Sequence, residues 1–160
     1  MPVDTGRVAG RRELHMSTLN ELRREVNQVG QVKHRLLGNW TLGQILAHVA
    51  ISFRIAVDGA PFRPPWWLRL IAPLLKNRML QRPMRSGFKL PSNMEATFIP
   101  KPEVTTAEGL AELERQLSRF EQTPQLAPHS VFGPFTRDEW TQFLLRHAEM
   151  HLSFVIPESG

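Results

Sequence analysis

Two histidines one helical turn apart give the strongest chemical signal in the sequence. His147 and His151 are four residues apart, so on an α-helix with about 100° per residue they lie about 40° apart. Apolar residues such as Phe143, Leu144 and Phe154 share this face of the predicted helix. A buried ring nitrogen without a partner costs about 1–3 kcal/mol, and a divalent metal ion between the two rings would satisfy both. The spacing therefore indicates two ligands of one metal ion.

His48 is the candidate third ligand. It lies on another predicted helix, at the edge of an apolar stripe and beside Ile45 and Ser52. Three histidines leave coordination positions open, which is typical of catalytic rather than closed structural metal sites. The alternative is that all three are core histidines that hydrogen-bond to their neighbours. Spacing alone does not decide between the two interpretations.

The amino-acid composition narrows the chemistry further. The chain has no cysteine and no tyrosine. This excludes disulfides, zinc–thiolate sites, cysteine nucleophiles and phenol catalysis, so any metal must be held by His, Asp or Glu. An all-nitrogen site suits zinc, nickel, copper or iron, and we predict zinc or nickel. No general base is evident, because Glu149 points away from His147 and His151 on the helical wheel.

The other polar candidates have simpler explanations. Gln44 and Ser52 flank His48 by one turn on either side, where they would orient the ligand or contact a substrate, and a purely structural role is the alternative. His15 and His34 are predicted to be solvated. His129 lies in a loop before the last helix and is also predicted to be a surface residue, with a position at the mouth of the bundle as the alternative.

Four amphipathic helices must position these side chains. Each begins with a capping box, in which Thr is followed three residues later by Glu or Gln. The four pairs are Thr18 with Glu21, Thr41 with Gln44, Thr105 with Glu108, and Thr136 with Glu139. We expect the first helix to end at Gly30 and the last at about Val155, and we find no strand alternation.

These elements predict an all-α protein, a four-helix bundle. A short extra helix at residues 66–71, disturbed at Pro73, and a long irregular crossover at residues 82–104 separate the second and third helices of the bundle. Residues 1–16 are predicted to be a loose arm before a single domain at 17–160. A length of 160 residues with 41% apolar and 22% charged side chains suits one globular domain. No membrane span or signal peptide is predicted, so we expect a cytoplasmic protein.

The net charge of +5 is concentrated in the middle of the chain. Residues 61–102 carry eight basic side chains and only one acidic side chain, Glu95. We expect a short helix packed on the bundle with a solvated basic rim. Alternatively, the segment forms a lid in which Arg63, Trp66 and Trp67 bind an anionic substrate, or it contacts a membrane surface. Nucleic acid is the least favoured partner of this segment, because the sequence contains no nucleic-acid-binding motif.

Two stretches of sequence resemble a known family. Residues 38–50, GNWTLGQILAHVA, and residues 132–140, FGPFTRDEW, followed by His147 and His151, are similar to the second and last helices of the DinB-like superfamily. The similarity is greatest to a branch of unknown function and covers roughly residues 11–155. It implies a four-helix bundle with a divalent metal held by three histidines, matching His48, His147 and His151. It does not imply DNA binding.

The resemblance suggests two kinds of enzyme. Members of the superfamily are described as metal-dependent hydrolases, and some relatives are thiol-dependent transferases or isomerases that use a low-molecular-weight thiol. We therefore expect a metal-dependent enzyme that acts on a small molecule. The alternative is a non-catalytic helical bundle whose basic, Trp-rich segment 61–90 binds a partner, a membrane surface or an anionic ligand. Exposed Trp66 and Trp67 would also suit a homodimer.

Overall fold

The computed structural model describes residues 3–62, 64–87, 95 and 97–158. The fold is mostly helical, as predicted. Its elements, in chain order, are α1 (Leu19–Gln31), β1 (His34–Leu36), α2 (Leu42–Asp58), α3 (Trp66–Gln81), α5 (Thr106–Gln122), α6 (Arg137–Leu152) and β2 (Val155–Pro157). No helix among the described residues is long and apolar enough to span a bilayer.

All four predicted capping boxes are present. In α1, α2, α5 and α6 the threonine hydroxyl accepts a hydrogen bond from the third residue of the helix, whose side chain caps the threonine backbone in return. Each box satisfies two backbone N–H groups that the first turn leaves unpaired. The four helices therefore begin where the sequence predicts.

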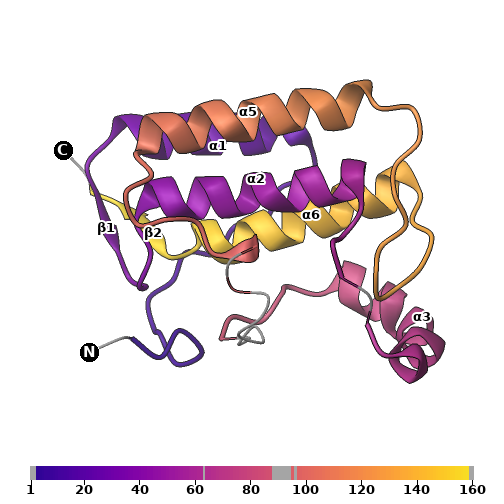
Figure 1. The fold of residues 1–160 in the computed structure, drawn as a ribbon. Helices are drawn as coiled ribbons and strands as arrows, with labels where there is room; N and C mark the ends of the chain where they lie inside the picture. Colours follow the sequence, from indigo (N-terminus) through magenta and orange to yellow (C-terminus); the bar gives the residue numbers. More distant parts are fainter. Residues whose placement is uncertain (1–2, 63, 88–94, 96, 159–160) are drawn as a thin grey trace.

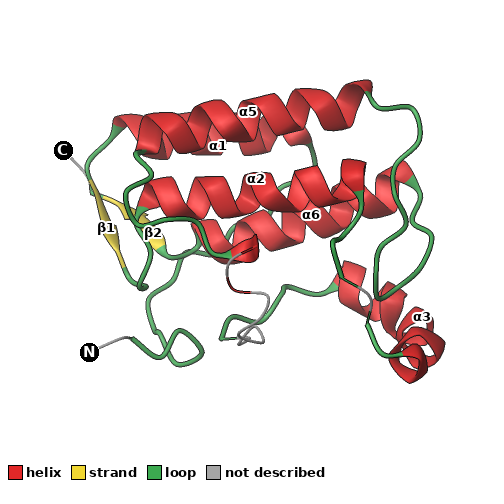
Figure 2. Ribbon diagram, viewed as in Figure 1, coloured by secondary structure: helices red, strands yellow, loops and turns green. Residues whose placement is uncertain are grey.

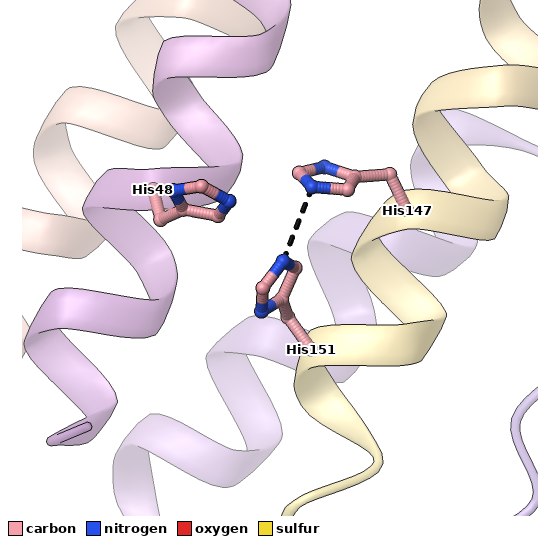
Figure 3. Close-up of side chains that lie close together, drawn as sticks. All are labelled: His48, His147 and His151. Atoms are coloured by element: carbon pink, nitrogen blue, oxygen red, sulfur yellow. Dashed lines mark hydrogen bonds between the residues drawn. The ribbon is translucent and has the colours of Figure 1, made fainter. Parts of the chain in front are cut away.

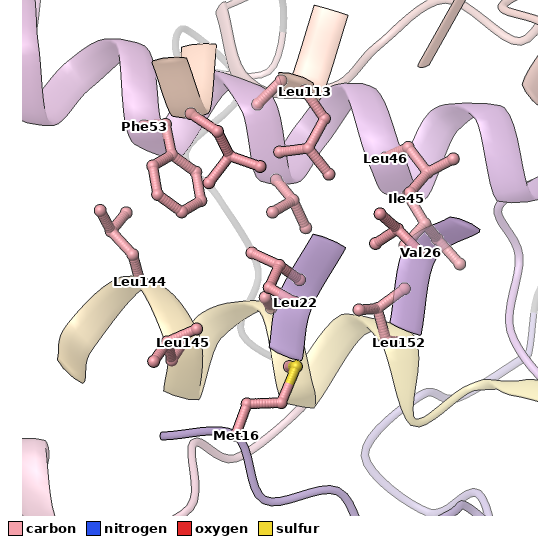
Figure 4. Close-up of a cluster of buried hydrophobic side chains, with 14 of the residues drawn as sticks. Met16, Leu22, Val26, Ile45, Leu46, Phe53, Leu113, Leu144, Leu145 and Leu152 are labelled. Carbon is pink, nitrogen blue, oxygen red and sulfur yellow. The ribbon is translucent and has the colours of Figure 1, made fainter. Parts of the chain in front are cut away.

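These four helices pack together, and α3 is set apart from them (Figure 1). Helix α2 packs against α5 and α6, and α1 packs against the same two helices. Their apolar faces meet in one core, in which Leu22, Leu46, Leu117 and Leu152 are completely buried. Figure 4 shows side chains from all four helices converging there. The core thus fixes α2 and α6, the helices that carry the three candidate ligands.

A two-stranded sheet corrects the all-α prediction (Figure 2). β1 pairs antiparallel with β2, with Arg35 opposite Ile156. The pairing was missed because each strand has three residues, too few to show alternation, and because the partners are far apart in sequence. The strand pair holds the segment that precedes α2 beside the segment that follows α6.

Two predicted helix ends were also wrong. Helix α6 ends at Leu152 rather than near Val155, because Val155 pairs with Leu36 in the sheet. Helix α1 continues past Gly30 to Gln31. A Cβ at Gly30 would lie 3.0 Å from Leu110 Cδ1, so this glycine lies where α1 approaches α5 closely instead of ending the helix.

Helix α3 is longer than expected. It runs from Trp66 to Gln81 and continues through Pro73, where the sequence predicts a disturbance. A proline inside a helix removes one hydrogen bond, and here the remaining turns continue on both sides. Lys76 forms a 2.6 Å ion pair with Glu139 at the start of α6, which attaches α3 to the rest of the protein. The predicted crossover at 82–104 lies partly outside the described residues.

The predicted loose arm is tied to α6 at its C-terminal end. The backbone N–H of Arg12 donates to the carbonyl of Ser153 at 3.0 Å, and that of Met16 donates to the Glu149 carboxylate. Arg146 donates to the Met16 carbonyl at 2.6 Å and forms a 2.7 Å ion pair with Glu149. Residues 11–16 therefore cover a face of α6 that carries buried charges.

Candidate metal centre

Helices α2 and α6 bring the three predicted ligands together. His48 projects from α2, and His147 and His151 project from successive turns of α6 toward it (Figure 3). One nitrogen from each ring lies within 4.8 Å of the others. The three histidines thus form a group that could hold a metal ion, as the sequence predicts.

Hydrogen bonds fix the orientation of two of the rings. His48 Nδ1 lies 2.6 Å from the carbonyl oxygen of Phe98. A carbonyl oxygen only accepts, so Nδ1 carries the proton and Nε2 keeps a free lone pair. His147 Nδ1 lies 2.9 Å from Ser52 Oγ, whose hydroxyl is directed at the His48 carbonyl at 3.5 Å. With its hydroxyl proton directed there, Ser52 accepts from His147 Nδ1, which leaves His147 Nε2 unprotonated.

The Nε2 atoms of His147 and His151 face one another. They are 3.1 Å apart, and because His147 Nε2 is unprotonated, His151 Nε2 donates the hydrogen bond between them (Figure 3). Neutral imidazole nitrogens grouped this closely are the donor set of a transition-metal site, and a bound ion would replace the proton between these two rings. A contact from the second ring nitrogen to a carbonyl or hydroxyl is the usual support of a metal-binding histidine. The residues present therefore fit a divalent ion.

Aromatic rings enclose the group. Trp40 stacks on His151, with ring centres 5.5 Å apart and planes at 7°, and its ring centre is 4.8 Å from that of His48. Phe143 lies parallel to His147 at 6.4 Å. These contacts restrict ring rotation and exclude water from one side of the group. Sequence analysis missed Trp40, although it directly precedes the α2 capping box.

Burial keeps the three histidines neutral. It lowers the pKa of His147 to about 3, with a smaller effect from His48. It also lowers the pKa of His151 well below the ordinary value, and the nearby His147, His48 and Arg11 add to the effect. The pKa of His48 falls through burial, and its hydrogen bond to the Phe98 carbonyl opposes this shift. Neutral imidazole is the form that binds a metal ion.

A cavity of about 1020 Å³ opens beside the histidines. Its wall is mostly apolar and includes Trp40, Phe98 and Phe143 as well as the three histidines. Arg85 and Glu95 are the charged residues among its described lining. A cavity of this size and polarity suits a small organic molecule.

The other predicted site residues have different positions. Ser52 lines the cavity and contacts His147, whereas Gln44 caps α2 and donates to the Pro100 carbonyl at 3.1 Å. Trp66 and Trp67 are exposed on α3 and do not line the cavity, although Leu68 does. Their predicted contact with substrate in this cavity is therefore not seen. Arg63 lies outside the described residues.

His129 was predicted to be a surface residue and is instead part of the cavity wall. Four aromatic rings surround it, with centres 4.9–5.3 Å away, and they belong to Phe132, Phe135, Trp140 and Phe143. Burial lowers the pKa of His129 to about 4. These four aromatic residues lie within fourteen positions of His129, so their density was the sequence signal that could have revealed it.

Comparison with known proteins gives one match. The sequence model of a family described as a protein of unknown function, DUF1569, matches residues 8–158. The chain belongs to this family. The match covers α2, α6 and all three histidines of the candidate centre, and it does not itself connect the DUF1569 family to the DinB-like superfamily. No curated protein and no solved structure was found to match the chain.

Proposed function

We propose that this protein is a metal-dependent enzyme whose divalent ion is bound by His48, His147 and His151. The observation that carries this proposal is the convergence of three ring nitrogens within 4.8 Å at the wall of a large cavity. Purely structural histidines are normally satisfied by the protein. Here Nδ1 of His48 and of His147 hydrogen-bonds to a protein oxygen, whereas Nε2 of His147 and Nε2 of His151 form a hydrogen bond with each other.

Each surrounding residue has a role in this proposal. The Phe98 carbonyl and Ser52 hold the rings of His48 and His147 with Nε2 directed inward. Trp40 holds His151 by stacking and shields the ligands from water. Zinc or nickel suits three imidazoles. A bound divalent ion would supply Lewis-acid chemistry that lowers the pKa of water or of a thiol toward neutrality.

We propose a bundle of α1, α2, α5 and α6 with DinB-like connections as the scaffold. The packing of α2 and α1 against both α5 and α6 supports it, together with the resemblance of residues 38–50 and 132–151. On that basis the substrate is a small organic molecule, and the reaction is hydrolysis or transfer of a low-molecular-weight thiol. The apolar cavity wall, with Arg85 as a cation, accommodates either class.

Metal analysis tests the site directly. We expect protein purified without a histidine tag to contain about one zinc or nickel ion per chain by elemental analysis. The variant His147→Ala should lose most of this metal and keep the helical circular dichroism spectrum, because the core residues Leu144 and Leu152 are unchanged. Loss of one of three ligands weakens binding by well over tenfold.

The matched control is His34→Ala, which removes a histidine from β1, away from the cavity lining. It should retain all of the metal. Full metal retention in His147→Ala would contradict the ligand assignment. No metal in the unmodified protein, and none taken up from added zinc or nickel, would contradict the proposed function. If metal binds, hydrolysis assays run with and without added thiols distinguish the two reaction classes.

A further inference from the structure

Helix α3 presents a large apolar face to solvent. Trp66 is 75% exposed and Leu74 is 83% exposed, values expected of polar surface residues. Four further large apolar side chains on the same helix are exposed: Trp67, Leu70, Ile71 and Leu75. Six such residues on one helix form a contiguous patch of a kind that monomeric proteins rarely leave uncovered.

The patch has the geometry of an amphipathic helix lying on a surface. At about 100° per residue, these six side chains span half of the helix circumference. The opposite side carries Ala72 and Leu80, which are buried against the rest of the protein. Helix α3 also projects away from the packed helices in Figure 1, so its outer face is accessible to a large, flat partner. Most of the exposed surface of α3 is therefore apolar, and the exposed arginines of the predicted basic rim lie at and beyond the C-terminal end of the helix.

The charge next to the patch has a single sign. Between residues 61 and 87 the sequence contains six basic side chains and no acidic one. Arg78 in the last turn of α3, Arg82 at its C-terminal end and Arg85 beyond it are exposed. Lys76 is paired with Glu139, so it contributes less to this charge. An apolar face with tryptophan at one end and arginine at the other is typical of helices that bind the interface of anionic membranes.

We propose that α3 binds an anionic membrane surface, with its apolar face inserted among the lipids and its arginines in contact with the headgroups. The proposal is independent of the metal site. Burial of large apolar side chains supplies most of the binding free energy, and each arginine adds attraction to the charged surface. The helix lies along the bilayer plane, because its sixteen residues are too short and too polar at one end to cross it.

A second copy of the chain fits the apolar face of α3 less well than an anionic membrane does. Pairing α3 with α3 would bring two segments together that each carry six basic and no acidic side chains at residues 61–87. Like charges at close range oppose such a dimer, whereas an anionic surface is attracted by the same charges. Pro65 and Leu68 at the start of α3 also line the cavity, so a bound membrane would lie close to that part of the cavity wall.

Binding to lipid vesicles tests the proposal. We expect the unmodified protein to co-sediment with phosphatidylglycerol vesicles, to bind phosphatidylcholine vesicles at least several-fold more weakly, and to lose binding as ionic strength rises. The double variant Trp66→Ser/Leu74→Ser should reduce partitioning by roughly tenfold or more, because two large apolar side chains no longer enter the lipid. Both positions are exposed, so the fold should be unaffected.

The matched control replaces exposed apolar residues outside α3, as Val3→Ser/Val32→Ser. It should bind as the unmodified protein does. Charge reversal in Arg78→Glu/Arg82→Glu should weaken binding to phosphatidylglycerol and leave the weak binding to phosphatidylcholine unchanged. The proposal is overturned if the unmodified protein binds no anionic vesicle at low salt, or if the α3 variant binds as tightly. A concentration-dependent dimer that the α3 variant abolishes, without vesicle binding, would also overturn it in favour of a second copy.

Discussion

Backbone hydrogen bonds and aromatic contacts hold the His129 ring in place. Its Nδ1 accepts hydrogen bonds from the backbone N–H groups of Val131 and Phe132, both at 3.2 Å. This leaves the proton on Nε2 and holds the ring among its aromatic neighbours. Protonation of Nδ1 would break both hydrogen bonds inside an apolar environment. The neutral form is therefore favoured in the folded protein, in agreement with its lowered pKa.

This residue should make the folded protein sensitive to acid. The pKa of His129 is about 4 when folded and 6.5 in an unperturbed histidine. Between these values the unfolded chain binds a proton that the folded protein does not, so stability falls as pH falls from 6.5 toward 4 and is unaffected above 6.5. The variant His129→Asn keeps an acceptor for the backbone N–H groups and removes the titrating ring.

Urea unfolding at several pH values measures this effect. We expect the free energy of unfolding to fall less steeply with acidity in His129→Asn, by up to about 1.4 kcal/mol per pH unit, which corresponds to one proton. The three histidines of the candidate centre affect the pH dependence of unfolding equally in both proteins. The difference between the two slopes is therefore due to His129. Equal slopes in the two proteins would show that His129 is not the group that titrates.

The residues of the candidate centre were easier to predict than their surroundings. His147 and His151 are found by local helical spacing, and His48 by its place on the next apolar stripe. The contact of His147 with Ser52 spans 95 positions and that of His48 with Phe98 spans 50. Such contacts depend on how helices and loops pack, which no local pattern specifies. The sequence therefore predicted the three grouped histidines, but it predicted only one of the residues that orient their rings, Ser52.

At the scale of elements, α2 and α5 approach most closely at two glycines. A Cβ on Gly43 would lie 2.1 Å from the Val104 carbonyl oxygen, and one on Gly109 would lie 2.7 Å from the Gly43 carbonyl oxygen. Both distances are too short for any side chain, and backbone atoms on the other side cannot rotate away. The two helices therefore pack with their backbones nearly in contact near their N-terminal ends, which sets the position of the α2 turn preceding His48.

Gly43→Ala should consequently be much more harmful than an alanine at another helical glycine. We expect it to lower the free energy of unfolding by about 2–3 kcal/mol, because α2 and α5 must separate. The comparison variant is Gly30→Ala in α1, where the new Cβ meets side-chain atoms alone, the flexible Leu110 at 3.0 Å and the Thr106 methyl group at 3.8 Å. There, the gain in helix propensity of up to about 1 kcal/mol offsets the tighter contact. Thermal or urea unfolding measures both, and equal effects would contradict this account.

Helices and strands were not equally predictable. Capping boxes and apolar stripes are local, so Thr41 with Gln44 and Thr136 with Glu139 located the starts of α2 and α6 correctly. The strands β1 and β2 exist because they pair with each other across about 120 positions, and neither has a local signal. Pro73 was expected to disturb α3, because proline has no backbone N–H to donate to the preceding turn. The helix nevertheless continues to Gln81, with the loss of this one hydrogen bond.

For the whole molecule, the N-terminal arm is part of the folded structure. Helix α6 carries the candidate ligands on one face and the buried Arg146–Glu149 ion pair on another. Met16 supplies both a donor for Glu149 and an acceptor for Arg146. The arm thus adds backbone hydrogen bonds to two buried charges that already form an ion pair with each other. The sequence suggested a loose segment, because the Met16 backbone is bonded to residues 130 and 133 positions away, which no local pattern reveals.

Truncation tests the contribution of the arm. Deletion of residues 1–16 should lower the free energy of unfolding by about 3 kcal/mol or more, because it removes the Met16 side chain from the core and the two backbone hydrogen bonds of Met16 to Arg146 and Glu149. Deletion of residues 1–10 keeps the contacts of Arg12 and Met16 and should cost far less. Unfolding of both truncated proteins in urea gives the comparison. Equal losses would place the stabilising contacts before residue 11.

The strand pair has a consequence for ligand binding. It joins the entry of α2 to the exit of α6, with flanking backbone hydrogen bonds from Leu37 to Phe154 at 3.0 Å and from Glu158 to Lys33 at 2.8 Å. The relative freedom of the helices bearing His48 and His151 is therefore already lost when the chain folds. Association with an ion would not have to supply that entropy, so the candidate site is preorganised by a strand pair that includes none of the three histidines.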